Sequence, residues 1–585
     1  MKWVCTLNSP VARRFATAGA LVIVSACGAA QDTQSRAAAS QAADAIYTGG
    51  DIVTVNDAQP VVEALAVKDG KILAVGTRTD VEKAHRNAAT TIVDLGGRTL
   101  LPGFIDAHGH YISALTVANQ VNVYAPPAGP GTDPDAIVAA VAKFRDANRV
   151  APGELIQAYG YDENVMPGGN PLNRDHLDRA FPANPVIVGH VSMHGAVLNS
   201  AALEKYGYSA AYKTPPGGVV VRKPGTQEPY GLIMETAYLP VFSALPKPTR
   251  EQEAAWSTAG QMLYAAAGIT LAHEGATHAD ELDVMQRAAA AGANIIDVVA
   301  YPFMTDLTKI IAANPVSGWG KYDRHLKIGG VKITVDGSPQ GKTAFFTTPY
   351  LSGGPGGEKN WRGEPSMPQD ELNQLVKHVY ALNVPLIVHT NGDAAIDMFL
   401  KAYELARNGD FSRPWNVTTI HTQFMRKDHI EKFVKYRIRP SFYTLHTFYF
   451  ATAHTTNRGP EQAAYISPMR DAIDAGLRPT NHTDFYVAPL DQMFMMWSAV
   501  NRVSREGGVL GPDQRITPME ALKSQTIWAA EQYDEQASKG TLEVGKSADL
   551  VILDKNPLKV APMAIKDIHV VETIKEGKTI YKRRP

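Results

Sequence analysis

This sequence has very little cysteine, no long run of apolar residues and no excess of charge of either sign. Cysteine occurs only twice in 585 residues, and the formal net charge is -1. The scarcity of cysteine argues against a small domain held by disulfides, and no run reaches the roughly 20 apolar residues of a membrane-spanning helix. Balanced charge argues against a basic surface for nucleic acid. We therefore expect a globular protein with a large core and no nucleic-acid partner.

The N-terminus has the pattern of an export signal. Basic residues precede the short run Phe15 to Ala26, which is apolar and rich in small residues, as in secretory signals. The run ends in VSACG at residues 24–28, which resembles a bacterial lipobox. We expect residues 1–26 to be removed as a lipoprotein-type signal peptide and Cys27 to be lipidated. The protein would then be anchored to the cell envelope, at its periplasmic or outer-membrane face, and would meet the membrane only through this lipid. The alternative is an ordinary signal peptide and a periplasmic protein.

Both ends of the remaining chain have the texture of short antiparallel strands. Residues 27–44 are small and polar and predict a flexible tether. Residues 45–101 contain alternating apolar runs broken by Asp69-Gly70 and Gly96-Gly97, which indicate hairpins. Residues 536–585 repeat this pattern. Because neither end has enough strands to be stable alone, we expect both to form one composite small β-sandwich domain.

The central residues 102–535 alternate between short strand-like runs and helical stretches. Strands separated by helices predict a parallel sheet, and eight of them predict an α/β fold of the closed (β/α)8, TIM-barrel type. The interval of about 115–265 has Pro-Gly and Gly-Gly clusters and predicts a cap inserted into the barrel. The eight predicted strands are 102–108, 268–274, 295–302, 326–335, 384–389, 417–421, 439–445 and 477–483.

Polar residues gather at the carboxyl ends of these strands, where the active sites of such barrels lie. Residues two apart on a strand point to the same face, so His108 and His110 can bind one metal together. Imidazole nitrogens and carboxylate oxygens suit zinc, with manganese, nickel and iron as alternatives. The polar residues at the strand ends are Asp106, His108, His110, His389, His421 and Asp484, with Lys332 inside the fourth strand.

Several motifs give these positions a specific resemblance. The segments PGFIDAHGH, GGVKITVDGS, VHTNGD, TTIHTQ, NHTD and GTLEVGKSADLVILD resemble those of the amidohydrolase superfamily. Within it, the chain is most similar to the amidohydrolase-3 branch, which includes N-substituted formamide deformylases. The resemblance runs from about residue 45 to the C-terminus.

The resemblance implies a site with a pair of divalent metals, zinc being expected. His108 and His110 would bind one metal, and His389 and His421 the other. Lys332 would bridge them after its amine has captured carbon dioxide as a carbamate, because an ammonium cannot bind a cation. The alternative for Lys332 is an ordinary buried lysine paired with a carboxylate, which would leave room for a single metal.

The same resemblance assigns the acid and base chemistry to Asp484. This carboxylate would ligate the first metal weakly, accept a proton from the attacking water and later protonate the leaving nitrogen. A metal lowers the pKa of bound water to roughly 7, which makes hydroxide available at neutral pH. The expected reaction is hydrolysis of a C–N bond in an amide, N-acyl or N-formyl group of a small molecule.

Other residues are candidates for binding the substrate or for supporting the ligands. A donor for the substrate oxygen is expected among His194, His446 and His482, each of which could instead orient a metal ligand. His273 follows the second strand and could do the same. The aromatic residues Tyr161 and Trp361, and the run 442–450, are core residues or part of an apolar substrate pocket.

Other functions stay open on this evidence. A mononuclear deaminase, or a hydrolase of cyclic amides, carbamates, ureas, esters or lactones, could use the same scaffold, because these reactions share a tetrahedral intermediate. A non-catalytic surface lipoprotein that binds a metal or ligand is the alternative from another class. The sequence leaves a homodimer open as well.

Overall fold

The computed structural model describes residues 41–191, 195–215, 218–354 and 358–584. The predicted signal peptide, Cys27 and His194 lie outside the described residues, so nothing in the structure bears on lipidation or on His194. Within the described ranges, no helix is both long and apolar enough to cross a membrane.

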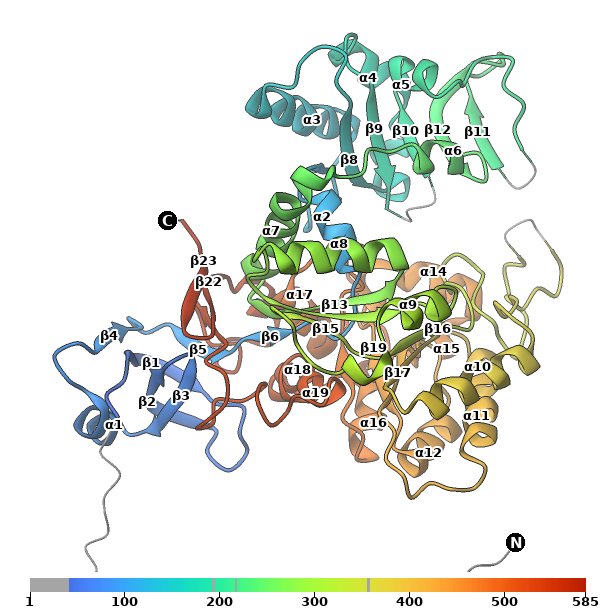
Figure 1. Ribbon diagram of the computed structural model, residues 1–585. Coiled ribbons are helices and arrows are strands. Elements are labelled where there is room, and N and C mark those ends of the chain that lie inside the picture. Colours follow the sequence, from blue (N-terminus) through green and yellow to red (C-terminus); the bar gives the residue numbers. More distant parts are fainter. Residues whose placement is uncertain (1–40, 192–194, 216–217, 355–357, 585) are drawn as a thin grey trace, which may run out of the picture. The chain divides into compact units, whose positions relative to one another are not determined.

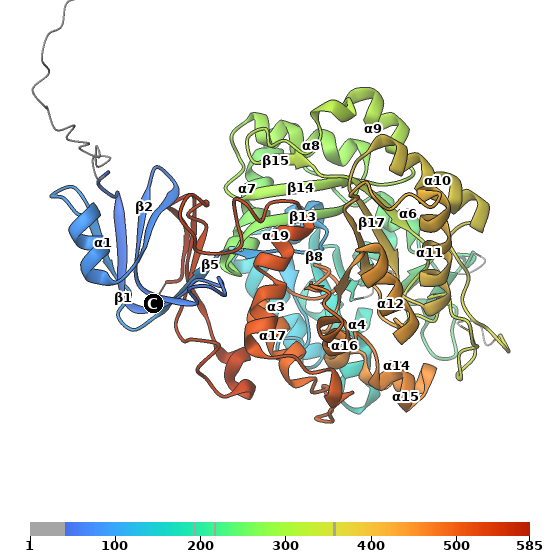
Figure 2. The ribbon, with the colours of Figure 1, turned by 90° about the horizontal axis from the view of Figure 1, so that it is seen from below.

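One sheet takes strands from both ends of the chain (Figures 1 and 2). Its order is β23-β22-β21-β5-β1-β2-β3, with β4 paired to β1. Antiparallel pairing of β5 with β21 joins the N-terminal and C-terminal strands. The strands are β1 (Ala45–Val53), β2 (Val61–Lys68), β3 (Lys71–Gly76), β4 (Thr91–Asp94), β5 (Thr99–Pro102), β21 (Leu550–Leu553), β22 (Val570–Lys575) and β23 (Lys578–Lys582). The helix α1 (Arg78–His85) packs Val81 against this sheet.

The centre of the chain contains two sheets whose neighbouring strands are parallel. Their orders are β15-β14-β13-β6 and β16-β17-β18-β19-β20. The strands are β6 (Phe104–Ile105), β13 (Ile269–Thr277), β14 (Asp297–Pro302), β15 (Leu326–Ile328), β16 (Val331–Thr334), β17 (Leu386–Thr390), β18 (Val417–His421), β19 (Arg439–Phe442) and β20 (Thr480–Asn481). Strands such as β14 and β18 are buried at every position, as expected for parallel strands covered on both faces.

The predicted strand 326–335 is interrupted, which is why two sheets are present. Gly329 and Gly330 separate β15 from β16. A Cβ at Gly330 would collide with the carbonyl oxygen of Pro385, so this close approach requires glycine.

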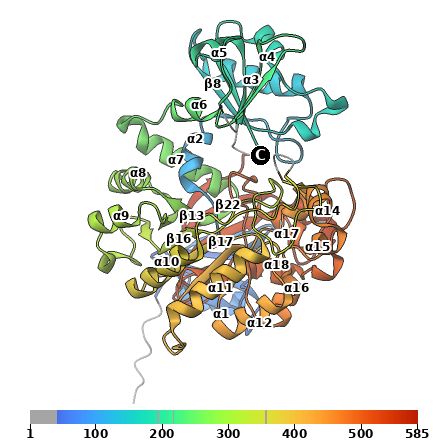
Figure 3. The same cartoon turned by 90° about the vertical axis from the view of Figure 1, so that its right-hand side faces the viewer.

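Helices alternate with the parallel strands (Figure 3), and several of them bury one apolar face. In α10, Leu372, Val376 and Val379 are buried at helical spacing. The helices that follow the cap are α7 (Arg250–Ala266), α8 (Ala279–Ala290), α9 (Leu307–Ala313), α10 (Gln369–Leu382), α11 (Asp393–Arg407), α12 (Lys427–Tyr436), α13 (His446–Tyr449), α14 (Ala451–Arg458), α15 (Pro460–Ala464), α16 (Met469–Asp474), α17 (Gln492–Asn501), α18 (Pro518–Ser524) and α19 (Ile527–Gln532).

The predicted insertion after α2 (Tyr111–Val117) forms a cap with its own sheet (Figure 1). The sheet order is β11-β12-β10-β9-β8-β7, and the cap has separate apolar clusters. Its contacts to the rest of the chain include a hydrogen bond from the Tyr124 hydroxyl to the Tyr486 carbonyl and an ion pair of 3.3 Å between Asp162 and Arg505. The elements are β7 (Val121–Asn122), α3 (Pro134–Asn148), β8 (Ile156–Tyr161), α4 (Arg174–Ala180), β9 (Val186–His190), β10 (Gly195–Leu198), α5 (Ser200–Lys205), β11 (Gly218–Arg222), β12 (Pro229–Glu235) and α6 (Leu239–Ser243).

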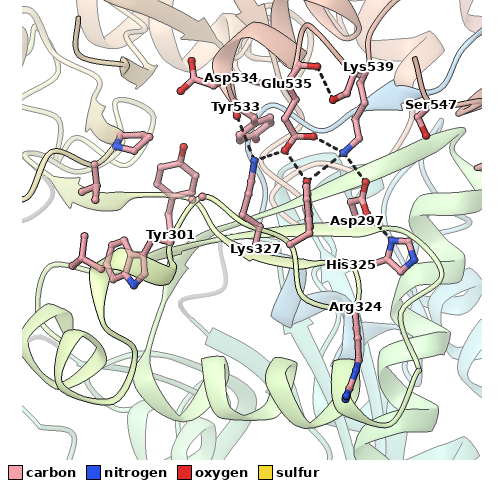
Figure 4. A pocket seen from close by; sticks show the side chains of 18 of the residues that line it. Asp297, Tyr301, Arg324, His325, Lys327, Tyr533, Asp534, Glu535, Lys539 and Ser547 are labelled. Atoms are coloured by element: carbon pink, nitrogen blue, oxygen red, sulfur yellow. Dashed lines mark hydrogen bonds and ion pairs between the residues drawn. The ribbon is translucent and has the colours of Figure 1, made fainter. Parts of the chain in front are cut away.

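A cavity of about 930 Å³ lies at the amino ends of β14, β15 and β17 (Figure 4). Buried charged side chains along it neutralise one another. Lys539 contacts Asp297 at 2.6 Å and also pairs with Glu535, which accepts a hydrogen bond from Lys327. This end of the strands carries no cluster of metal ligands among the described residues.

Candidate metal centre

The carboxyl ends of the parallel strands bring together residues that lie far apart in the sequence. Ligand atoms of His108, His421 and Asp484 all lie within 4.8 Å of one another, and the three side chains are buried. His108 follows β6, His421 ends β18, and Asp484 follows β20. Because parallel strands end at the same edge of a sheet, this convergence follows from the fold.

Asp484 is the carboxylate that links the histidines. Its Oδ1 lies 3.5 Å from Nε2 of His108 and 3.4 Å from Nε2 of His110. Its Oδ2 lies 4.0 Å from Nε2 of His421. Both Asp484 and His421 have positive φ angles, of 54° and 66°, a backbone conformation that is uncommon outside glycine and is concentrated at functional sites.

The remaining expected ligands lie beside this group. The rings of His389 and His421 have centroids 4.6 Å apart, and Nζ of Lys332 lies 3.5 Å from Nε2 of His108. Lys332 is only 2% exposed and forms no ion pair with a carboxylate in the described part of the chain. The structure thus brings all six predicted ligands to one place.

Two of the other predicted histidines, His482 and His273, contact the candidate ligands His421 and His108 at their Nδ1 atoms. Nε2 of His482 lies 3.1 Å from Nδ1 of His421, and Nδ1 of His482 lies 2.9 Å from the Ser441 hydroxyl. Nδ1 of His273 lies 3.2 Å from Nδ1 of His108. Contacts at Nδ1 fix the ring orientation and leave Nε2 for a metal.

Sequence reasoning missed Glu274, which lies 3.9 Å from Nδ1 of His110. Its carboxylate also accepts a hydrogen bond of 2.7 Å from the backbone N–H of Ile112, in the first turn of α2. Glu274 is 1% exposed. A charged residue directly after His273, at the carboxyl end of the predicted strand 268–274, is the sequence signal that could have identified it.

The pKa values of the histidines suit metal binding at His108 and His421. Burial lowers the pKa of both well below its ordinary value, so their rings are neutral and can offer a lone pair. Burial also acts to lower the pKa of His110, but the carboxylates of Asp484 and Glu274, 3.4 and 3.9 Å away, outweigh it and raise that pKa to about 10. A cation bound here would take the place of that proton.

The donor set fits a divalent metal. Buried Oδ1 of Asp484 and Nδ1 of His389 make no hydrogen bond of good geometry in the described structure. Oδ1 of Asp484 is 3.4 Å from Nε2 of His110, and Nδ1 of His389 is 3.4 Å from Oδ1 of Asp336. The spacing at Asp484, longer than an ordinary hydrogen bond, leaves its oxygen available to a cation. Imidazole nitrogens with a carboxylate oxygen are typical of zinc and related ions. His108, His421 and Asp484 are the core of this set.

The structure does not bring Tyr161 and Trp361 to this site. Tyr161 is fully buried in the apolar cluster of the cap, where its hydroxyl accepts a hydrogen bond of 3.0 Å from the backbone of Leu172. Trp361 donates to the carbonyl of Lys342 at 2.6 Å and packs against a separate cluster around Phe346. Both side chains complete these local cores, which is the first of the two roles expected for the aromatic residues.

His446 differs from the ligand histidines. Its Nδ1 lies 2.8 Å from Nε2 of His454 in α14, and its ring centroid lies 4.5 Å from that of Tyr443. The sequence analysis did not identify His454, because a histidine inside a polar helix has no distinguishing pattern.

A family model described as "Amidohydrolase family" matches residues 91–581. The chain belongs to the amidohydrolase family. This confirms the resemblance inferred from the motifs, and the chain is accordingly a metal-dependent hydrolase, an enzyme acting on carbon–nitrogen bonds other than peptide bonds.

Known relatives of this amidohydrolase extend over nearly its full length. It is 27% identical to an N-substituted formamide deformylase of Arthrobacter pascens, covering 93% of this chain and 99% of the relative. It is 26% identical to the putative amidohydrolase YtcJ of Bacillus subtilis, covering 92% and 99%. The structure resembles an uncharacterized metal-dependent hydrolase from Pyrococcus horikoshii with a TM-score of 0.69 and 22% identity, over 88% of this chain and 99% of that one. This similarity supports a TIM-like α/β fold with an additional sheet domain.

Proposed function

We propose that this amidohydrolase hydrolyses the C–N bond of a small N-acyl or N-formyl amide, with a pair of zinc or similar divalent ions as cofactors. The observation that carries the proposal is the convergence of His108, His110 and His421 around the carboxylate of Asp484. His389 lies beside His421, and Lys332 lies beside His108. Bound metals supply Lewis acidity, which lowers the pKa of water and polarises the substrate carbonyl.

Lys332 enters the site as a carbamate in this proposal. A buried ammonium without a carboxylate partner is unfavourable, and burial lowers the pKa of Lys332 to about 8. The free amine reacts with carbon dioxide, and the resulting carbamate carries oxygens that can bind cations. Its neighbour at 3.5 Å, Nε2 of His108, is itself an expected ligand.

Asp484 moves the proton. It accepts a proton from water as the water oxygen bonds to the carbonyl carbon, and it delivers that proton to the nitrogen as the C–N bond breaks. The products are a carboxylic acid and an amine, so atoms and charge balance. Two contacts at the same Oδ1 atom, to His108 and His110, hold the carboxylate for both steps.

We infer further that the two parallel sheets close into one (β/α)8 barrel. Parallel bridges pair Phe303 with Lys332 and Gly109 with Phe485, and the N–H of His110 donates to the carbonyl of Phe485 at 2.8 Å. These contacts support closure at both open edges. A closed barrel gives all the strand ends one common mouth.

The relative named as a formamide deformylase favours an N-formyl or other N-substituted amide as substrate. Cyclic amides, carbamates, esters and lactones stay as alternatives, because their hydrolysis needs the same site. Export and lipidation at Cys27 are part of the proposal and are tested separately. A Cys27→Ser variant should be absent from the membrane fraction, and its mass should lack the contribution of the lipid.

The first test is elemental analysis of metal per chain, with bicarbonate and zinc supplied during expression. A value near two metals supports the carbamate-bridged site, one metal removes Lys332 from the ligand set, and none overturns the proposed mechanism. The same preparation is then assayed against N-formyl and N-acetyl amines, with esters and lactones of matched size alongside. Release of amine in preference to alcohol supports amide hydrolysis.

A further inference from the structure

The Tyr443 side chain lies beside the ligand histidines. It follows β19, in which Ser441 contacts His482, and residues two apart share a face of a strand. The Tyr443 ring centroid lies 5.4 Å from that of His482 and 6.2 Å from that of His421. The strand therefore directs this phenol toward the metal centre.

The hydroxyl of Tyr443 has no partner. The residue is 1% exposed, and its oxygen forms no hydrogen bond within the described part of the protein. Leaving such a group buried without a partner costs about 1–3 kcal/mol. By contrast, the equally buried Tyr403 in α11 donates to the carbonyl of Tyr436 at 3.1 Å. The missing partner of Tyr443 points to a ligand atom.

We propose that the Tyr443 hydroxyl donates a hydrogen bond to the carbonyl oxygen of the substrate as that oxygen becomes negatively charged. As water adds to the carbonyl carbon, the electron pair of the C=O bond moves to this oxygen. The pair returns when the C–N bond breaks, and Tyr443 keeps its proton throughout. A preorganised donor of this kind stabilises the transition state more than the ground state. The proposal rests on the proposed amide hydrolysis.

The histidines that could compete for this role are already engaged. Both ring nitrogens of His482 are in contact, one with Ser441 and one with His421. The tautomer of His446 depends on its contact with His454. A phenol is protonated at neutral pH, and burial raises the pKa of Tyr443 further. Of these candidates, Tyr443 is therefore the one that carries a proton at neutral pH and can donate it in a hydrogen bond to the substrate oxygen.

The test compares Tyr443→Phe with Tyr403→Phe as the matched control. Both substitutions remove only a hydroxyl from a residue that is 1% exposed. For Tyr443→Phe we expect kcat to fall by about 10²–10³-fold, with KM changed much less and with metal content and thermal midpoint retained. Tyr403→Phe should keep wild-type kcat. Equal kcat values for Tyr443→Phe and wild type would overturn the inference and leave amide hydrolysis intact.

A binding measurement separates this role from a structural one. The probe is the methylphosphonamidate of the amine released from the best substrate, whose tetrahedral phosphorus imitates the intermediate. Calorimetry should show that Tyr443→Phe weakens this probe by about the same factor as kcat/KM, with affinity for the free amine unchanged. Equal weakening of both ligands would instead indicate a distorted pocket and overturn the proposal. A wild-type chain inactive on every amide would remove the proposed function, and this inference with it.

Discussion

At the scale of single residues, the site depends on one carboxylate surrounded by imidazoles. Asp484 lies within 4.0 Å of His108, His110 and His421, and among the described residues its Oδ1 makes no hydrogen bond of good geometry. Burial acts to raise its pKa, but the contact with His110 and the positive charge of that ring outweigh this and lower it. Asp484 is therefore ionised at neutral pH and able to accept a proton.

Replacement of Asp484 by asparagine removes the proton acceptor without changing the size of the side chain. We expect kcat to fall by about 10²–10⁴-fold, with the fold retained by circular dichroism. Asp534→Asn, at an exposed carboxylate, is the control and should keep full activity. A folded Asp484→Asn enzyme with wild-type turnover would show that the proton is carried elsewhere.

Replacement of Lys332 by arginine puts a permanent cation at this position and prevents carbamate formation. We expect bound metal to fall from near two per chain to one or less, together with activity, as measured by elemental analysis. Lys327→Arg is the matched control, since Lys327 is also buried, at 5% exposure, but lies at the cavity of Figure 4. Unchanged metal content in Lys332→Arg would remove the carbamate from the mechanism.

At the scale of elements, the break between β15 and β16 shows how backbone packing positions the site. β16 begins directly after the Gly329-Gly330 pair, and Lys332 is its second residue. The N–H of Val331 donates to the carbonyl of Pro385 at 2.9 Å, which draws the two backbones together. Glycine is needed there, and the position of Lys332 depends on it.

Gly330→Ala should destabilise the protein by about 1–3 kcal/mol, as overpacking in a core does. Its Cβ would meet the Pro385 carbonyl and part of the Tyr301 ring. Gly318→Ala is the control, because an added Cβ there meets nothing within 4 Å. Urea denaturation followed by fluorescence measures both variants. Equal urea midpoints for the two variants would show that the backbones at Gly330 and Pro385 can move apart without loss of stability, and would contradict the prediction.

At the scale of the whole described chain, buried ion pairs tie the small sheet to the parallel strands. Lys575 in β22 contacts Asp297, the first residue of β14, at 2.6 Å and Asp549 at 2.8 Å. Burial acts to raise the pKa of Asp297, but Lys575 and Lys539 outweigh it and hold the pKa well below its usual range. Burial likewise acts to lower the pKa of Lys575, and its two carboxylate partners raise it overall.

These opposite shifts set the pH window of the stabilisation. Asp297 has a lower pKa in the folded protein than in the unfolded chain, where it is about 4. Its contribution to the free energy of unfolding is therefore present above about pH 4 and is lost as pH falls through the pKa of the folded state. Lys575 has a higher pKa in the folded protein than in the unfolded chain, where it is about 10.4. Its contribution to the free energy of unfolding is therefore present below about pH 10.4 and is lost as pH rises through the pKa of the folded state. Both contributions are complete at neutral pH.

Lys575→Met should therefore cost about 3–5 kcal/mol near pH 7, because it leaves buried Asp549 without its ion pair and removes one of the two lysines that contact Asp297. The difference from wild type should shrink in acid, because the buried carboxylates that have lost a cation in the variant can then be protonated and become neutral. Lys559→Met is the control, since Lys559 pairs with Asp51 while 68% exposed, and such pairs contribute less than about 1 kcal/mol. Urea midpoints across pH test this, and a gap between Lys575→Met and wild type that is independent of pH would refute it.

The sequence by itself determined the family, through its motifs, and identified the candidate ligands. His108 and His110 could be paired because strand alternation is local, and the polar residues at the other strand ends could be grouped with them because parallel strands share a carboxyl edge. The sequence left Tyr161 open between a core and a substrate pocket, since a strand pattern does not say which core its buried face joins.

Only the tertiary structure decided which residues support the ligands. Glu274 reaches His110, Ser441 reaches His421 through His482, and the Tyr443 hydroxyl is left unpaired. The contacts of Glu274 and Ser441 join residues that lie on or after different strands, and the Tyr443 hydroxyl lacks a hydrogen-bond partner because of how those strands pack. They depend on the register between strands, which is fixed by packing over the whole core and not by any local pattern.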